Sequence, residues 1–138
     1  MSVAKCLNMF DDGLKGKERR KQLRDEAKVL FRNVEMTNKD FNHKVVVSGR
    51  SIKEILNQPH RYFNEKNETI LKIDKLFSTS KFIGKLTKEN PKDDFISYLF
   101  ETEIAKSKSW IIVRKYDLSK DYSIYSISDQ ERLLKYIK

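Results

Sequence analysis

Few side chains in this 138-residue sequence suit acid–base chemistry, and the best placed follow one β-branched run. Residues 45–60 read VVVSGRSIKEILNQPH and carry Arg50, Lys53 and His60. Imidazole titrates near neutral pH and can move a proton, while the two cations can hold a phosphate at a helix start. This set would suit metal-free RNA cleavage, in which protein charges stabilise the negative charge that develops. In the plainer interpretation, His60 is an exposed turn residue and both cations are solvated.

A second polar cluster is expected on two neighbouring strands. Ser109 and Arg114 share the first strand with Trp110, and Tyr125 and Ser126 lie on the next. If Arg114 and Tyr125 share an open sheet face, they can hold a phosphate and stack a base. Alternatively, Trp110 lies in the core and Tyr125 covers the edge of that core with its hydroxyl in water.

The charge balance favours contact with polyanions. The chain has 29 Lys and Arg against 20 Asp and Glu, which gives a net charge of +9. Much of this charge falls in residues 15–28, which form either an RNA-binding stripe or an ordinary solvent face. A lysine-rich composition alone can produce the same excess, so charge does not decide between these interpretations.

Several function classes are disfavoured. No apolar stretch is long enough to span a bilayer, and no secretory signal is recognisable, so a cytoplasmic protein without membrane partners is expected. Cys6 is the only cysteine, so neither an intramolecular disulfide nor a zinc site is expected. The glycine-rich and HExxH motifs are missing, so no cofactor or metal is expected.

The elements that must position these residues begin with helices. Residues 17–34 carry an apolar stripe made of Leu23, Ala27, Leu30, Phe31 and Val34. A short strand is expected at 44–48. A capping box formed by Ser51 and Glu54 predicts a helix that Pro59 stops, and a second helix is predicted at about 64–77.

Strands follow the helices. Four are predicted, at 81–86, 95–104, 109–117 and 121–129, and their short connections indicate an antiparallel meander. The last strand changes phase between Ile124 and Tyr125, which indicates a bulge. Another capping box, from Ser128 to Glu131, predicts a short C-terminal helix. The fold class is α+β, with N-terminal helices packed on one face of a four-stranded antiparallel meander. Residues 1–16 are expected to form a mobile arm, and 17–138 a single domain.

The segments VVVSGRSIKEIL and FISYLFETEIAKSKSWIIVRKYDLSKDYSIYSI resemble the ribonuclease-like domains grouped as barnase, EndoU, colicin D/E5 and RelE. The likeness is to variants attached to phage head-morphogenesis and large polyvalent proteins, and it covers about residues 44–128. It implies helices on a four-stranded sheet and metal-independent cleavage of RNA or tRNA. The early basic motif of these domains falls on Arg50, Lys53 and Glu54, where many members have a histidine that this chain lacks.

The resemblance also implies roles for the later strands. Its polar positions fall on Ser109, Arg114 and Ser126, which makes Ser126 a catalytic candidate beside His60. The main hypothesis is thus a phage- or mobile-element-encoded RNase-like domain, toxin-like and acting inside a host cell, with a host or immunity protein as a further partner. The alternatives are a non-enzymatic protein that binds host nucleic acid or protein, and an interaction module of a phage particle.

Overall fold

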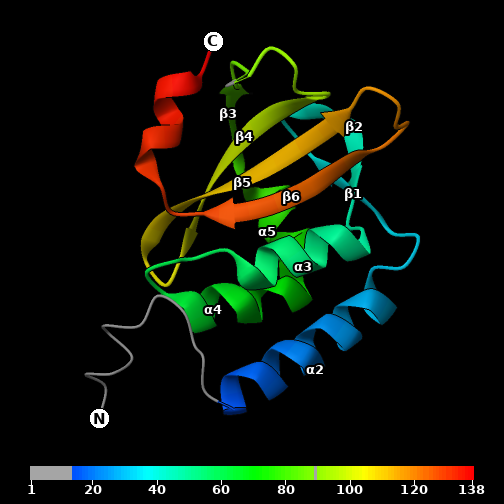
Figure 1. Ribbon diagram of the computed structural model, residues 1–138, viewed down its shortest axis with the longest axis vertical. Helices are drawn as coiled ribbons and strands as arrows, with labels where there is room; N and C mark the ends of the chain where they lie inside the picture. The colour runs from blue at the N-terminus through cyan, green and yellow to red at the C-terminus, as the bar shows by residue number, and fades with distance from the viewer. Residues whose placement is uncertain (1–13, 89) are drawn as a thin grey trace.

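The computed structural model describes residues 14–88 and 90–138 of the chain (Figure 1). The sheet and the main helices form two groups, and helices α2, α3 and α4 lie together at one end of the sheet. The elements in chain order are α2 (Leu14–Leu30), β1 (Glu35–Asn38), β2 (Phe41–Val46), α3 (Gly49–Asn57), α4 (Phe63–Glu68), the 3₁₀ helix η1 (Thr69–Lys72), α5 (Ile73–Thr79), β3 (Lys81–Lys85), β4 (Phe95–Ile104), β5 (Ser107–Tyr116), β6 (Tyr122–Ser128) and the 3₁₀ helix η2 (Glu131–Tyr136).

The sheet has six strands rather than the four that were predicted, in the order β1-β2-β6-β5-β4-β3. The predicted meander is present as β3 to β6, and the shift of register beside Ile112 and Val113 confirms the bulge at Tyr125. Outside the meander, β2 overlaps the short strand expected at 44–48, and it joins β6 in parallel through Val45 and Tyr122. Only β1 was not predicted, because its four residues EMTN contain a single apolar side chain, Met36.

Helix α3 begins earlier than the sequence indicated. Ser48 is the N-cap, with its hydroxyl accepting from the Ser51 amide at 3.0 Å, and the Ser51 hydroxyl accepts from the Ser48 amide at 3.1 Å. The predicted box of Ser51 and Glu54 is therefore wrong. Because Ser48 is already extended, its own hydroxyl can cap the helix, and Ser51 becomes the third helical residue.

The other helices also differ in detail from their predictions. The single helix expected at 64–77 is divided into α4, η1 and α5, and the Thr69 hydroxyl donates to the Lys66 carbonyl at 2.6 Å where α4 ends. At the N-terminus, α2 already includes residues 14–16 of the expected arm, while residues 1–13 lie outside the described part of the chain. Leu23, Ala27 and Phe31 are buried as the stripe predicted, whereas Leu30 is 48% exposed.

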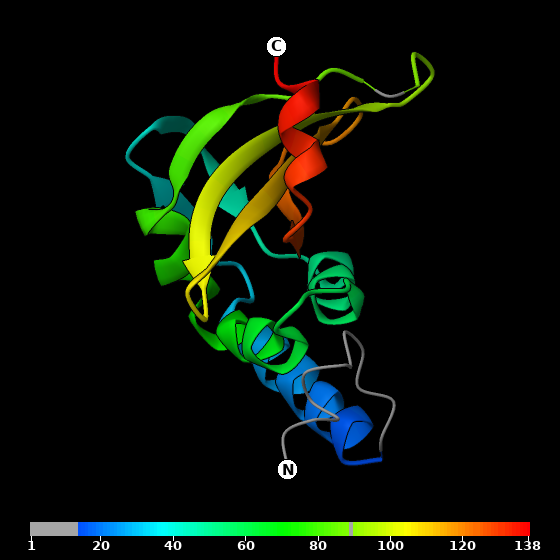
Figure 2. The same cartoon turned by 90° about the vertical axis from the view of Figure 1, so that its left-hand side faces the viewer.

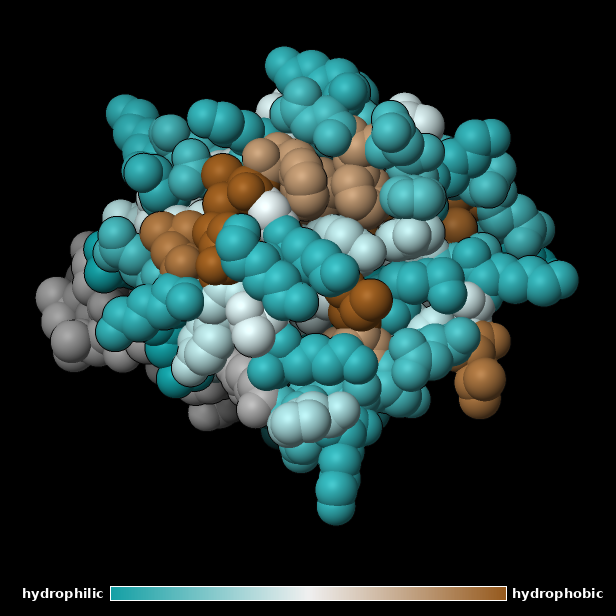
Figure 3. Space-filling view, turned by 90° about the horizontal axis from the view of Figure 1, so that it is seen from above, coloured by the Kyte–Doolittle hydropathy of each residue, from teal (hydrophilic) through white to brown (hydrophobic). Residues whose placement is uncertain are grey.

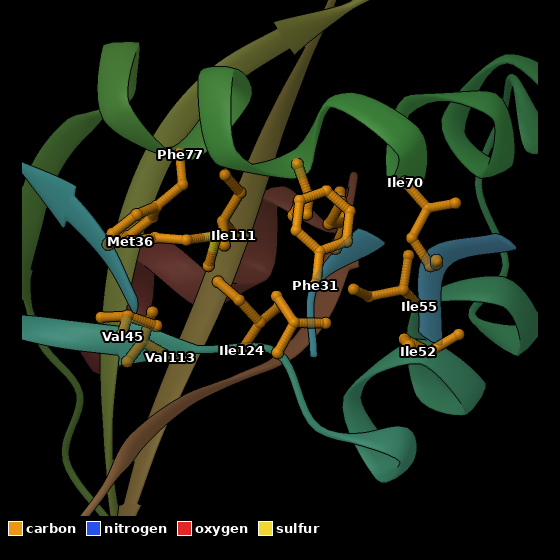
Figure 4. Close-up of a cluster of buried hydrophobic side chains, with 14 of the residues drawn as sticks. Phe31, Met36, Val45, Ile52, Ile55, Ile70, Phe77, Ile111, Val113 and Ile124 are labelled. Atoms are coloured by element: carbon orange, nitrogen blue, oxygen red, sulfur yellow. The ribbon is translucent and has the colours of Figure 1, made fainter. Parts of the chain in front are cut away.

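The main core fills the space between the helices and one face of the sheet. Its side chains come from α2, α3 and α5 on one side and from β2, β5 and β6 on the other (Figure 4). Ile111 and Val113 of β5 point into this core, and Ile52 and Ile55 of α3 belong to the same core on the helical side. The helices are therefore held by apolar packing, the dominant favourable contribution to folding.

The opposite face of the sheet has a smaller core of its own. Leu99, Trp110 and Ile112 are buried there, and Leu133 and Ile137 from the C-terminal segment pack against them. In Figure 2, η2 and α5 lie on opposite sides of the sheet. Trp110 is 2% exposed, in agreement with the core interpretation. The face that was expected to be open is therefore partly covered by η2.

The surface is predominantly hydrophilic in the view from above, where apolar groups form separate patches between hydrophilic side chains (Figure 3). Among the described residues, no helix is both long enough and apolar enough to cross a lipid bilayer.

Candidate functional site

His60 is fully buried, and both of its ring nitrogens have partners. Nδ1 accepts from the Tyr62 amide at 2.8 Å, so in the neutral ring Nε2 carries the proton and donates to Ser109 Oγ, also at 2.8 Å. The Ser109 hydroxyl in turn donates to the Ser107 carbonyl at 3.2 Å. Burial, assisted by the charge of Lys66, lowers the pKa of His60, although Asp129 opposes this shift. The arrangement anchors the 58–62 turn to β5.

A buried lysine lies beside this anchor. Lys66 of α4 is fully buried, and its ammonium donates to the Ile55 carbonyl near the end of α3 and lies 4.7 Å from the centre of the Phe63 ring. Burial lowers the pKa of Lys66 to about 7, and the charge of Arg20 adds to this effect. No feature of the sequence indicates this role, because a lysine in a charged helix is normally solvated.

Arg114 and Tyr125 are in contact. The Arg114 guanidinium carbon lies 3.4 Å from the centre of the Tyr125 ring and 3.8 Å from that of Phe95. Ser126 lies opposite Ile112, and directly opposed residues share a face, so Ser126 is on the same side of the sheet as Arg114. Ser126 is 1% exposed, so substrate has little access to its hydroxyl in this conformation.

Ser109 lies on the other side of the sheet. Residues two apart in a strand share a face, so Ser109 is on the same face as Ile111 and Val113, which point into the main core. Arg114 is on the opposite face with Ile112, which belongs to the smaller core. His60 and Ser109 are therefore separated from Arg114 and Ser126 by the sheet itself. The structure forms two pairs rather than one convergent group.

Arg50 and Lys53 diverge from the same helix. The Arg50 guanidinium carbon lies 5.3 Å from the centre of the Tyr116 ring, beside a small hollow that Tyr125 also lines. Lys53, three residues later, faces the groove between α3 and α2. Glu54, the next residue, is half-buried. The catalytic roles of Arg50, Lys53, His60 and Ser126 stay predictions, and the substrate roles of Ser109, Arg114 and Tyr125 likewise.

The groove between α2 and α3 has a volume of about 390 Å³ and a strongly basic lining. Its lining residues are Lys17, Arg20, Lys21, Arg24, Lys28, Gly49, Lys53, Leu56 and Asn57. Six of these nine carry a positive charge and none carries a negative one, although Asp25 approaches Arg24 to 3.8 Å from outside the groove. The basic stripe of α2 was recognisable in the sequence, but the position of Lys53 across from it was not.

Two contacts fix the walls of this groove. Arg19 of α2 donates from Nε and Nη2 to the two carboxylate oxygens of Glu68, at 2.6 and 2.5 Å. Leu23 and Ala27 of α2 are buried in the main core beside Ile52 and Ile55 of α3. Both helices are therefore held against the rest of the domain, and the cations project from a supported surface.

Nothing in the described part of the chain is arranged as a metal centre: no group of three or more His, Cys, Asp or Glu side chains is placed to hold an ion.

Comparison with known proteins gives one match. Searches among curated proteins and among solved structures each find no similar chain. The family model for large polyvalent protein-associated domain 3 matches residues 15–125. This match supports the phage association that the resemblance implied. The matched segment runs from α2 into β6 and includes the basic groove, the pair of His60 and Ser109, and Arg114, but it ends one residue before Ser126. Because the matched segment is more than half of the chain, the protein belongs to the large polyvalent protein-associated domain 3 family.

Proposed function

We propose that this domain binds nucleic acid through the groove between α2 and α3 and does not cleave it. The observation that carries the proposal is the groove lining, with six cations and no carboxylate. Phosphate contacts from Lys and Arg supply most of the affinity of sequence-independent nucleic-acid binding. The net charge of +9 favours association with such a polyanion over long range.

The spacing of the cations suits a backbone ligand. Lys17, Lys21, Arg24 and Lys28 follow one another at intervals of four, three and four residues, which places them on one face of α2. This face is about 16 Å long at 1.5 Å per residue. Lys53 adds a cation from the opposite wall, so a phosphate chain lying in the groove is contacted from both sides.

Binding without cleavage is proposed because the expected proton carrier is not available to a substrate. His60 is buried with both nitrogens hydrogen-bonded, and the lowered pKa keeps its ring neutral at physiological pH. Ser126, another member of the expected catalytic set, lies across the sheet from His60, as does Arg114, the expected phosphate-binding residue. Cleavage would need these groups within hydrogen-bonding reach of one phosphate.

The test measures binding and cleavage on the same samples. Fluorescence anisotropy with labelled single-stranded RNA, tRNA and duplex DNA is recorded in chelator across a salt series, and each RNA is then examined on a denaturing gel. We expect binding that weakens steeply with salt, and intact RNA. The double variant Lys21→Glu, Lys28→Glu should weaken binding at least about tenfold at low salt.

The matched control changes the net charge by the same amount, but at lysines outside the groove. Lys75→Glu, Lys108→Glu alters two exposed lysines outside the groove and should have a much smaller effect. Equal losses in both double variants would show that only net charge matters, which contradicts the proposed groove. If the unmodified protein cleaves RNA and the His60→Ala variant does not, the nuclease interpretation is restored.

A further inference from the structure

We infer that a cavity on the sheet face opposite the main helices is a binding site for a small aliphatic carboxylate, held by Arg114. The cavity has a volume of about 90 Å³ and lies between the connection from β3 to β4, strands β4 and β5, and η2. Arg114 lines it together with Ser97, its direct partner across β4 and β5. This site is separate from the proposed nucleic-acid groove and does not depend on it.

The rings around Arg114 restrict how a ligand can approach. Phe95 and Tyr125 lie 3.8 and 3.4 Å from the guanidinium carbon, so the positive charge interacts with two aromatic rings. Nη1 contacts the Tyr116 hydroxyl at 3.5 Å. An anion is then best accepted in the plane of the guanidinium, which is the geometry of paired hydrogen bonds to a carboxylate.

One donor of Arg114 is left without a partner. Nε is buried and makes no hydrogen bond to any described residue. Buried donors of this kind are uncommon in folded proteins, because each loses its interaction with water without replacement. A carboxylate oxygen at Nε would restore that interaction, with a small adjustment of the side chain to admit it.

The rest of the lining sets the size and chemistry of the ligand. The volume corresponds to about three water molecules at roughly 30 Å³ each, so only a few non-hydrogen atoms fit. Leu86, Ile112 and Leu133 line the cavity and suit a short alkyl group. Lys88 and Asp93 also line it with opposite charges, so Arg114 supplies the remaining positive charge, which a singly charged carboxylate matches better than a doubly charged phosphate.

The test uses propionate as the probe on the full chain. Amide and arginine side-chain resonances are followed by NMR during titration with propionate, with propionamide and with inorganic phosphate. We expect saturable shifts at Ser97 and at the Arg114 Nε–H with propionate, with a dissociation constant below about 10 mM. Propionamide and phosphate should bind at least about tenfold more weakly.

Variants assign the binding to Arg114. Arg114→Gln should weaken propionate binding at least about tenfold, whereas Arg132→Gln, which changes an exposed arginine outside the cavity, should not. If Arg114→Gln fails to fold, the comparison of propionate with propionamide on the unmodified chain still decides. Equal binding of the two, tighter binding of phosphate, or no saturable shift would overturn the inference.

Discussion

Nε2 of His60 lies 2.8 Å from Oγ of Ser109, although the two residues are 49 positions apart in the chain. The contact joins the turn after α3 to the start of β5, beneath the main helical layer. A histidine that looks catalytic in the sequence is therefore a tertiary anchor in the fold, and this changes what its replacement should do.

Replacement of His60 should affect stability before any activity. His60→Ala removes both ring hydrogen bonds and leaves a cavity, so we expect the free energy of unfolding to fall by about 2–4 kcal/mol. His43→Ala, at the other and exposed histidine, should change it much less. Urea denaturation of both variants checks this. Equal stability of His60→Ala and the unmodified protein would contradict the anchoring role.

The same histidine should make stability depend on pH. Because burial lowers the pKa of His60 in the folded state, the unfolded chain takes up the proton first as the pH falls. The free energy of unfolding should therefore decrease below about pH 6.5. This decrease should be smaller in His60→Ala than in the unmodified protein. Denaturant midpoints measured between about pH 5 and pH 7.5 separate these cases.

Lys66 should act in the same direction at higher pH. Its folded pKa of about 7 lies below the ordinary value of 10.5, so lowering the pH through this interval destabilises the folded state, with most of the loss complete near pH 7. The unmodified protein should therefore gain stability relative to Lys66→Met between pH 7 and pH 9.5, by up to about 1.4 kcal/mol per pH unit. Lys72→Met, at an exposed lysine, serves as the control in the same denaturation series. Parallel pH profiles for Lys66→Met and the unmodified protein would exclude a buried titrating lysine.

Asn38 ties the first hairpin to the end of α5. Its buried Nδ2 donates to the carbonyls of Phe77 and Ser80, at 2.6 and 2.8 Å. Asn38→Asp replaces this donor with an acceptor facing two carbonyl oxygens, so it should cost about 3 kcal/mol or more, and more than Asn38→Ala. Thermal unfolding of the two variants at pH 7 gives the order. If Asn38→Asp lowers the unfolding temperature less than Asn38→Ala does, the amide contacts do not hold the hairpin.

The number of groove contacts should be readable from the salt dependence of binding. Each phosphate contact contributes about 0.7 to 0.9 to the slope of log affinity against log salt. We therefore expect Lys21→Ala and Lys53→Ala each to reduce the slope by about that amount, because they face each other across the groove. Arg50→Ala, on the other side of the α3 N-terminus, should leave the slope nearly unchanged. If Lys53→Ala and Arg50→Ala change the slope equally, the ligand does not follow the groove.

The parts of the fold that follow from local pattern were predictable. The alternation of β4 and the phase change at Tyr125 gave the meander and its bulge, and the apolar stripe gave α2. The strand at 44–48 was also predicted and overlaps β2, but β1 was not, because this four-residue strand relies on distant partners such as α5. The groove needed the packing of α2 against α3, which places Lys53 beside cations far from it in the chain. The burial of His60 likewise depends on Ser109, and no local feature of the NQPH turn indicates it.

The parallel pairing of β2 with β6 has a consequence for synthesis of the protein. Val45 and Tyr122 are neighbours in the sheet, so the first hairpin cannot join it until nearly the whole segment up to β6 has left the ribosome. A nascent chain that has emerged only through α5 carries β2 with an unpaired edge and the main core without β5 and β6. Folding of this domain should therefore be completed after translation of β6, and until then the exposed hairpin is the segment most open to chaperones or to premature association.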